Sequence, residues 1–311
     1  MKWLLKLVAA FSVLTQDVAA RRVCENDELQ VDVYHLASAP VQFQNVSLFW
    51  SPQTFTLIHS ATEAVLIDAP IVAQDGTDLA NWISKTAPGK TLKYMYITHA
   101  HGDHFNSFPQ ILAKFPEAQV VATQGVIEHL PLQYEPPTWD RLWQALFPDV
   151  QQANLSLVKP LSSSANFFIN GKANKKFEFR AIQVGEGDTT HSTVMYVPSI
   201  DLVVGGDVVY GHCYQWLVEN LTPQLRNQWI ASLDKVKALK PKVVVPSHTQ
   251  EQEGFGHGHL QETQDYIRGW GELLTRAKTW QELEALAKAR WPDRIGSVVL
   301  RDSAEAFFGA A

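Results

Sequence analysis

One short segment constrains the fold of this chain more than any other. Residues 98–104 read Thr-His-Ala-His-Gly-Asp-His, and they follow an apolar run at 92–97 that predicts a strand. Imidazoles and carboxylates are costly to bury unless they are paired or bind a metal. Packing alone therefore does not explain three histidines and an aspartate in six residues. The sequence predicts a metal site at the end of this strand.

The spacing inside the segment suggests two metal positions. His99 and His101 are two residues apart, so in extended backbone their side chains can point to the same side. Gly102 permits a sharp turn that presents Asp103 and His104 to a neighbouring position. One metal ion could bind the first pair, and another could bind the second.

The rest of the chain alternates short apolar runs with helical patterns, which predicts a sheet-rich α/β protein. Strands are expected over residues 31–36, 54–59, 64–68, 92–98, 119–122, 177–184, 193–197, 202–206 and 243–246. Helices are expected over residues 77–85, 107–115, 223–239, 260–278 and 280–290. Thr222 precedes Pro223 as an N-cap, and Thr279 with Glu282 forms a capping box.

At the histidine segment the chain resembles the metallo-β-lactamase superfamily, whose HxHxDH signature is matched by His99, His101, Asp103 and His104. The resemblance implies a four-layer αββα sandwich. It also implies a carboxylate that bridges two metals, a last histidine ligand, and an acid that orients the ligand loop. In this chain those roles fall to Asp207, His248 and Asp68, each at the end of an expected strand.

One element departs from the family pattern. The family usually has Gly-His-Thr just after a strand and before the bridging aspartate, whereas residues 184–191 read Val-Gly-Glu-Gly-Asp-Thr-Thr-His. Glu186 occupies the expected register, and His191 is the nearest imidazole. A carboxylate can bind zinc but is a harder ligand than imidazole. Both Glu186 and His191 are therefore kept as candidate ligands.

The resemblance implies a metal-dependent hydrolase with two divalent ions, zinc first, with iron or manganese as alternatives. A hydroxide bridging the ions would attack an ester, thioester, lactone or lactam of a small molecule. Asp103 would orient this hydroxide and pass its proton to the leaving group. The rival interpretations are a mononuclear iron oxidoreductase like the persulfide dioxygenases, and a non-catalytic binding protein stabilised by metal.

Two aromatic stretches are candidates for the substrate pocket. Tyr210, His212, Tyr214 and Trp216 follow the expected bridging Asp207 directly. Residues 133–149 gather tyrosine, tryptophan and phenylalanine, which predicts a lid, a pocket wall or an amphipathic surface helix. These residues favour an apolar or aromatic substrate.

Composition excludes several partners. The net charge is −6 and no basic run occurs, so nucleic-acid binding is not expected. Two cysteines exclude a disulfide framework and a cysteine-rich zinc site. No linker divides residues 30–311, which predicts one catalytic domain over residues 21–311 with a helical extension from about residue 255. The sequence does not indicate an oligomeric state.

The N-terminus suggests export. Residues 1–20 have a basic start, an apolar run and small residues near position 20, as in a signal peptide. The run is too short for a stable membrane anchor. Three sequons, at Asn45, Asn154 and Asn220, agree with a glycosylated, secreted chain. The predicted location is the secretory pathway or the periplasm.

Overall fold

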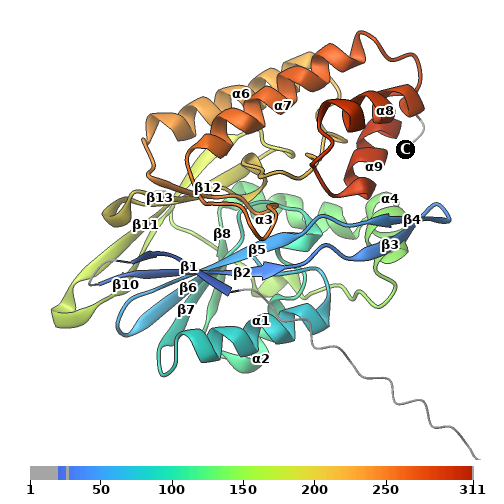
Figure 1. Ribbon diagram of the computed structural model, residues 1–311. Helices are drawn as coiled ribbons and strands as arrows, with labels where there is room; N and C mark the ends of the chain where they lie inside the picture. The colour runs from blue at the N-terminus through green and yellow to red at the C-terminus, as the bar shows by residue number, and fades with distance from the viewer. Residues whose placement is uncertain (1–19, 26–27, 310–311) are drawn as a thin grey trace, which may run out of the picture.

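The computed structural model describes residues 20–25 and 28–309, which form two β-sheets packed face to face with helices on both outer sides (Figure 1). Helices α1 (Ala73–Thr86) and α2 (Phe108–Lys114) lie below the first sheet, and α6 (Pro223–Ala238) and α7 (Gly258–Leu274) lie above the second. This is the four-layer αββα arrangement that the sequence predicted. The signal-peptide prediction falls almost entirely outside the described residues and stays a prediction.

The first sheet has seven strands in the order β1-β2-β5-β6-β7-β8-β9. These strands are β1 (Ala20–Glu25), β2 (Gln30–Leu36), β5 (Gln53–His59), β6 (Glu63–Ile67), β7 (Thr91–Tyr96), β8 (Gln119–Ala122) and β9 (Lys159–Pro160). Pairing is antiparallel from β1 to β6 and parallel from β6 to β9. Because β6 and β7 run parallel, the residues that follow them emerge at the same edge of the sheet.

The second sheet has five strands in the order β10-β11-β12-β13-β14. They are β10 (Asn166–Asn170), β11 (Lys176–Gly185), β12 (Ser192–Val197), β13 (Leu202–Val204) and β14 (Val243–Val245). The parallel pair β13 and β14 ends in the segments that carry Asp207 and His248. A register shift in β11 between Gln183 and Gly185, where Gly185 has φ +100°, changes the direction of the chain that follows.

A separate hairpin, which the sequence analysis did not predict, is formed by β3 (Pro40–Phe43) and β4 (Val46–Phe49). The sequon residue Asn45 lies in its exposed turn with φ +65°. The hairpin contacts the C-terminal helix α9 (Ser297–Ala306), since the Phe49 amide donates to Ser297 Oγ at 2.9 Å. Two distant parts of the chain thus meet at one end of the sandwich (Figure 1).

The predicted helices are present with shifted ends, and their caps are confirmed. Thr222 Oγ1 accepts from the Leu225 amide at 3.2 Å, and Thr279 Oγ1 accepts from the Glu282 amide at 3.2 Å. Helix α8 spans Trp280–Arg290 as predicted, whereas α9 was missed. Helix α3 (Gln124–His129) precedes the aromatic stretch. The stretch itself folds as short helical pieces, which are a 3-10 helix (Leu130–Tyr134), α4 (Pro136–Thr138), a π-helical turn (Trp139–Trp143) and α5 (Gln144–Leu146).

The hydrophobic core fills the spaces between the layers. Between the two sheets, Val33, Tyr96, Phe179 and Met195 are almost completely buried in one cluster. A second cluster joins Val244 of β14 to residues of α6, α7, α8 and α9. The helices of the predicted C-terminal extension therefore share their core with the second sheet.

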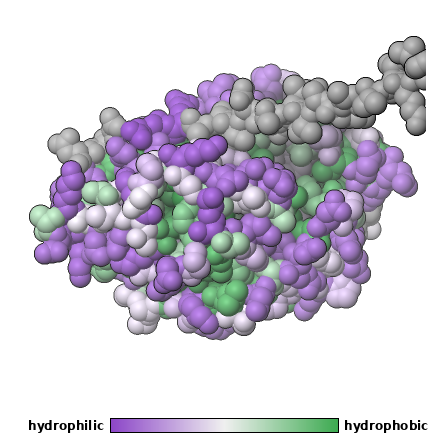
Figure 2. Space-filling model, turned by 90° about the horizontal axis from the view of Figure 1, so that it is seen from below, coloured by the Kyte–Doolittle hydropathy of each residue, from purple (hydrophilic) through white to green (hydrophobic). Residues whose placement is uncertain are grey.

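The surface seen from the side of α1 and α2 is largely hydrophilic, with hydrophobic side chains gathered in patches near its middle (Figure 2). Within the described part of the chain, no helix has the length and apolar character needed to cross a membrane.

We expect Trp229→Ala to destabilise the fold by about 3–5 kcal/mol, because it empties a fully buried position. It also removes the 2.9 Å hydrogen bond from Trp229 Nε1 to the Val208 carbonyl. Urea unfolding measures the change. The control is Phe49→Ala, at a side chain that is 54% exposed, with an expected change within about 0.5 kcal/mol. Equal effects of the two variants would contradict this account of the core.

Candidate metal centre

The edge where the parallel strands end carries the histidine segment. After β7 the chain extends through His99 and His101, then turns through the short 3-10 helix Gly102–His104. The segment after β13 approaches it closely, because Gly206 has φ +49° and a Cβ there would lie 2.7 Å from Thr98 Oγ1. Only glycine tolerates both conditions. Gly206 therefore allows the aspartate that follows it to reach the histidine segment.

Six of the predicted ligands converge in space. Candidate ligand atoms fall into three buried groups, with all atoms of a group within 4.8 Å of one another. The groups are His99, His104 and Asp207, then His99, His101 and Asp188, and finally Asp103, His104 and His248. Asp207 Oδ1 lies 3.2 Å from His104 Nε2, and Asp207 Oδ2 lies 3.2 Å from His248 Nε2. Side chains from position 99 to position 248 thus surround one small volume.

The groups include Asp188 and neither of the two predicted alternatives, Glu186 and His191. Glu186 is half-buried outside them, and the exposed His191 lies against the ring of His129 at 4.4 Å. The register shift at the end of β11 changes the direction of the side chains that follow, so Asp188 lies among the donor groups and Glu186 and His191 do not. A signal was present in the sequence, because residues 187–189 read Gly-Asp-Thr, which keeps both neighbours of the family's histidine.

Asp188 is held in place by its own loop and by Asn220. Asp188 Oδ2 lies 3.0 Å from His101 Nδ1, and Asp188 Oδ1 lies 4.0 Å from His99 Nε2. The Asn220 amide donates to the carbonyls of Gly187 at 3.1 Å and Asp188 at 2.8 Å. Asn220 is fully buried by these contacts, so the fold leaves no room for a glycan there. The sequon residue Asn154 is exposed.

Hydrogen bonds on the far side of each ring orient the histidines. Asp68 Oδ2 lies 3.1 Å from His104 Nδ1, and this carboxylate also accepts from the Thr98 amide at 2.8 Å. Glu219 Oε1 lies 2.8 Å from His101 Nε2. The Pro52 carbonyl lies 2.9 Å from His248 Nδ1. Such partners fix which ring nitrogen faces a metal.

Of these orienting partners, the sequence analysis placed only Asp68. Glu219 lies 118 positions from His101, and Pro52 lies 196 positions from His248. No local motif marks either residue, so sequence reasoning had no means of finding them.

Two further side chains hold the carboxylates. Gln53 Nε2 donates to Asp103 Oδ2 at 2.9 Å and to the Asp103 carbonyl at 3.0 Å. Tyr210 Oη donates to Asp207 Oδ2 at 2.6 Å and lies 3.3 Å from Asp188 Oδ2. The Tyr210 ring stacks on His248 with 5.5 Å between centroids. Gln53 and Tyr210 thereby reduce the freedom of the carboxylates before any ligand binds.

Burial and mutual contact shift the pKa values in this cluster. Burial holds the pKa of His99 well below its usual value, so this imidazole is neutral and able to bind a metal. Burial raises the pKa of Asp188 to about 7, against the opposing effect of His101. For His248, burial is outweighed by the carboxylates of Asp207 and Asp103, and its pKa rises to about 10. Burial together with Asp207 raises the pKa of Tyr210, which keeps the phenol a donor.

The donor set fits divalent metal ions. His99 Nε2, His104 Nε2, Asp188 Oδ1 and Asp207 Oδ1 are buried without a hydrogen-bond partner in the described structure. Leaving such atoms unpaired is costly, and here they lie in the mutually close groups described above. Imidazole nitrogen and carboxylate oxygen are ligands for zinc, iron and manganese. Cations at these positions would satisfy the unpaired atoms.

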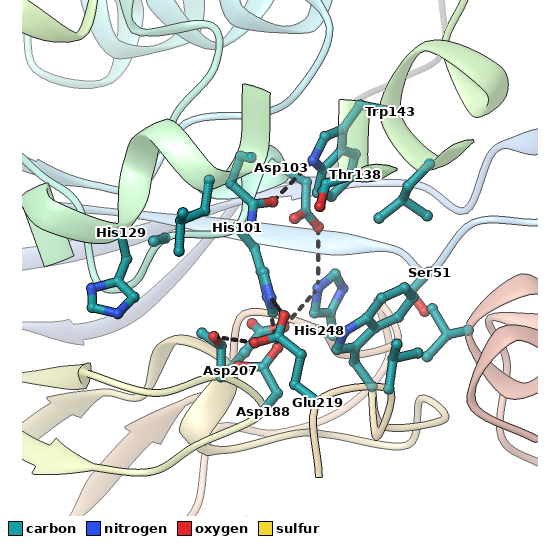
Figure 3. A pocket seen from close by; sticks show the side chains of 18 of the residues that line it. Ser51, His101, Asp103, His129, Thr138, Trp143, Asp188, Asp207, Glu219 and His248 are labelled. Carbon is teal, nitrogen blue, oxygen red and sulfur yellow. Dashed lines mark hydrogen bonds and ion pairs between the residues drawn. The ribbon is translucent and has the colours of Figure 1, made fainter. Parts of the chain in front are cut away.

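A cavity of about 420 Å³ opens onto this cluster, and Figure 3 shows His101, Asp103, Asp188, Asp207 and His248 facing it. Its other lining residues come from distant parts of the chain: Trp50, Ser51, Ala100, His129, Leu132, Gln133, Thr138, Arg141, Leu142, Trp143, Thr189, Thr190, Tyr210, Trp216, Val218, Glu219 and Val299. Residues 133–143 of the aromatic stretch, together with Leu132 just before it, form one wall. This is the pocket-wall alternative of the sequence analysis.

Two of the four predicted pocket residues line the cavity, and two do not. Tyr210 and Trp216 face it, whereas His212 is half-exposed beside Glu262, with 3.4 Å between His212 Nε2 and Glu262 Oε2. Tyr214 is buried, and its hydroxyl donates to the Trp291 carbonyl at 3.1 Å. Residues close in sequence to Asp207 thus diverge because the chain turns toward α7 and α8.

Comparison with known proteins agrees with this geometry. The family model described as the metallo-beta-lactamase superfamily matches residues 48–248, which is more than half of the chain. A hydroxyacylglutathione hydrolase from Synechococcus sp. (strain CC9605) is 33% identical over 101 residues. That match covers 32% of this chain and only 35% of the relative's length.

Solved structures show the same fold. The metallo-beta-lactamase from Pontibacter korlensis has a TM-score of 0.55 at 16% identity, covering 80% of this chain and 99% of its own. The metallo-beta-lactamase from Hirschia baltica has a TM-score of 0.52 at 14% identity, covering 80% of this chain and 97% of its own. From the family match, the fold and the converging donor set, the chain belongs to the metallo-β-lactamase superfamily.

Proposed function

We propose that this protein is a two-metal hydrolase that cleaves an ester, thioester, lactone or lactam bond of a small molecule. The observation that carries the proposal is the arrangement of two donor groups around Asp207 on one side of the cavity. His99, His101 and Asp188 would hold one ion, and Asp103, His104 and His248 would hold the other. Asp207 is grouped with His99 of the first set and His104 of the second, so its carboxylate can serve both.

When bound, two divalent cations would lower the pKa of water from its very high bulk value toward about 7 and polarise a carbonyl oxygen. The protein's own groups supply orientation and proton transfer. Asp103, held by Gln53, faces the cavity with Asp103 Oδ2 3.5 Å from His248 Nε2. Its carboxylate can accept a proton from the attacking water and return it to the leaving group. Asp68, Glu219 and the Pro52 carbonyl fix the ring orientations of their histidine partners.

One observation favours a second candidate. With Asp188 in place of a third histidine, each set contains two histidines and one carboxylate. That donor set is typical of non-heme iron oxygenases with open coordination positions. An iron-dependent oxidoreductase like the persulfide dioxygenases is therefore the alternative. Two zinc ions per chain would support the hydrolase, and one iron with oxygen consumption on a persulfide would support the alternative.

Metal removal tests the proposed function. We expect a chelator to abolish hydrolysis of ester, thioester, lactone and lactam probes, and added zinc to restore it, because water activation depends on the cations. Metal in thousandfold excess over its Kd should also stabilise the fold by about 4 kcal/mol for each bound ion, measured by thermal unfolding. Hydrolysis that survives metal removal, with metal content verified by elemental analysis, would contradict the proposal.

Replacing Asp103 tests its role in proton transfer. Asp103→Asn should lower kcat/KM by about a hundredfold to ten-thousandfold, because an amide cannot accept the proton. The measurement is steady-state kinetics on the best probe, with circular dichroism to verify the fold. The control is Asp149→Asn, the same substitution at an exposed aspartate away from the cavity. Unchanged turnover in Asp103→Asn would refute the role.

The assignment of Asp188 as a ligand, in place of Glu186 or His191, predicts a contrast in metal content. Asp188→Ala should reduce bound metal from two ions to about one per chain, because the first set loses its carboxylate. Glu186→Ala and His191→Ala should keep both ions, since neither side chain belongs to a donor group. Elemental analysis after dialysis measures the ratio. Loss of metal from Glu186→Ala or His191→Ala with retention in Asp188→Ala would restore the original interpretation.

A further inference from the structure

The charges around the cavity point to its substrate class. We propose that the site selects uncharged esters, lactones or lactams with an apolar or aromatic body, and that it discriminates against substrates that carry a carboxylate away from the scissile bond. This inference rests on the proposed function and adds the charge of the substrate to it.

The cavity lining is rich in carboxylates. Asp103, Asp188, Asp207 and Glu219 line it, and Figure 3 shows Glu219 reaching His101 from the cavity side. Two divalent cations would balance these four carboxylates and leave no surplus positive charge for an anionic substrate. An incoming carboxylate would also approach Glu219, whose side chain is 42% exposed. Two carboxylates that come close to each other repel.

Among the described residues that line the cavity, Arg141 is the only lysine or arginine, and it is already paired. Its Nη1 donates to Asp302 Oδ1 at 2.8 Å, and its Nη2 lies 3.4 Å from Asp302 Oδ2. Asp302 is fully buried on α9, so removing its partner would leave a buried charge uncompensated, which is strongly unfavourable. Arg141 therefore compensates the charge of Asp302 and does not bind a substrate carboxylate.

Six large apolar side chains form much of the remaining wall. Trp50, Trp143 and Trp216 line the cavity together with Leu142, Val218 and Val299. The rings of Trp50 and Trp143 pack edge to face with 5.8 Å between centroids. Moving an ionised carboxylate against such a wall is costly without a partner, whereas an apolar or aromatic body gains from burial. The volume of about 420 Å³ suits a small molecule.

A matched pair of lactones tests the proposal on the metal-loaded wild-type enzyme. The probes are 3,4-dihydrocoumarin and its 6-carboxylate derivative, which differ only in a charge remote from the scissile bond. We expect kcat/KM for the neutral lactone to exceed that for the charged one by about tenfold or more, with most of the difference in KM. Equal rates, or a preference for the charged lactone, would overturn the proposal. Hydrolysis of neither lactone, nor of any probe in the wider screen, would instead refute the proposed function.

A variant of the ion pair provides a second test. Asp302→Asn removes the carboxylate that pairs with Arg141. The ratio of kcat/KM for the neutral lactone to that for the charged lactone should then fall several-fold, because KM for the charged lactone decreases. The matched control is Asp201→Asn, which breaks the exposed pair of Asp201 and Lys242 (2.7 Å) away from the cavity and should leave the ratio unchanged. An unchanged ratio in a folded Asp302→Asn enzyme would contradict the role of the pair. The wild-type comparison tests the proposal even if this variant does not fold.

Discussion

The structure depends on a group of buried polar atoms. These atoms can be satisfied only by contacts with one another or by bound cations. Four imidazoles and several carboxylates lie almost completely out of solvent at the edge where the parallel strands end. Isolated, each such group would oppose folding. Together they form mutually close donor sets, and a hydrogen bond on the far side of each ring fixes its orientation. The sheets supply the rigid edge from which these side chains project.

Asp188 gives this centre its particular character. The family pattern has a histidine at the corresponding position, and here a carboxylate stands in a loop held by Asn220. Both donor sets therefore contain two histidines and one aspartate, around the shared Asp207. Carboxylates are harder ligands than imidazoles, so the first set suits zinc less strongly and iron or manganese better than three histidines would. Tyr210 contacts both Asp207 and Asp188 and links the two sets.

The substrate cavity is built from parts of the chain that have little to do with metal binding. The π-helical turn Trp139–Trp143 contributes Arg141 and two large apolar side chains, and α9 contributes Val299 and the buried Asp302. The pair of Arg141 and Asp302 ties this wall to the C-terminal helix. The ion pair that fixes this wall also neutralises the guanidinium of Arg141. The ion pair of Arg141 and Asp302 therefore affects both the packing of this wall and the proposed selectivity for uncharged substrates.

The sequence determined the elements whose signals are local. Hydrophobic period and capping residues located most of the strands and the helices α6 and α8, because these signals lie within a few neighbouring residues. The histidine segment also marked the site, since so many imidazoles in one turn have no role in packing. The hairpin β3–β4 and helix α9 were missed. Their stability comes from contacts with each other, as in the bond from Phe49 to Ser297, and local pattern does not report such contacts.

Only the tertiary structure decided which side chains reach the centre. The register shift at Gly185 selected Asp188 over Glu186 and His191. The turn after Asp207 placed Tyr210 and Trp216 at the cavity but sent His212 and Tyr214 away from it. Gln53, Glu219 and Pro52 became partners of residues far along the chain. The physical reason is that side-chain direction depends on exact backbone turns and long-range packing, whereas residue type and spacing record only what a segment can do.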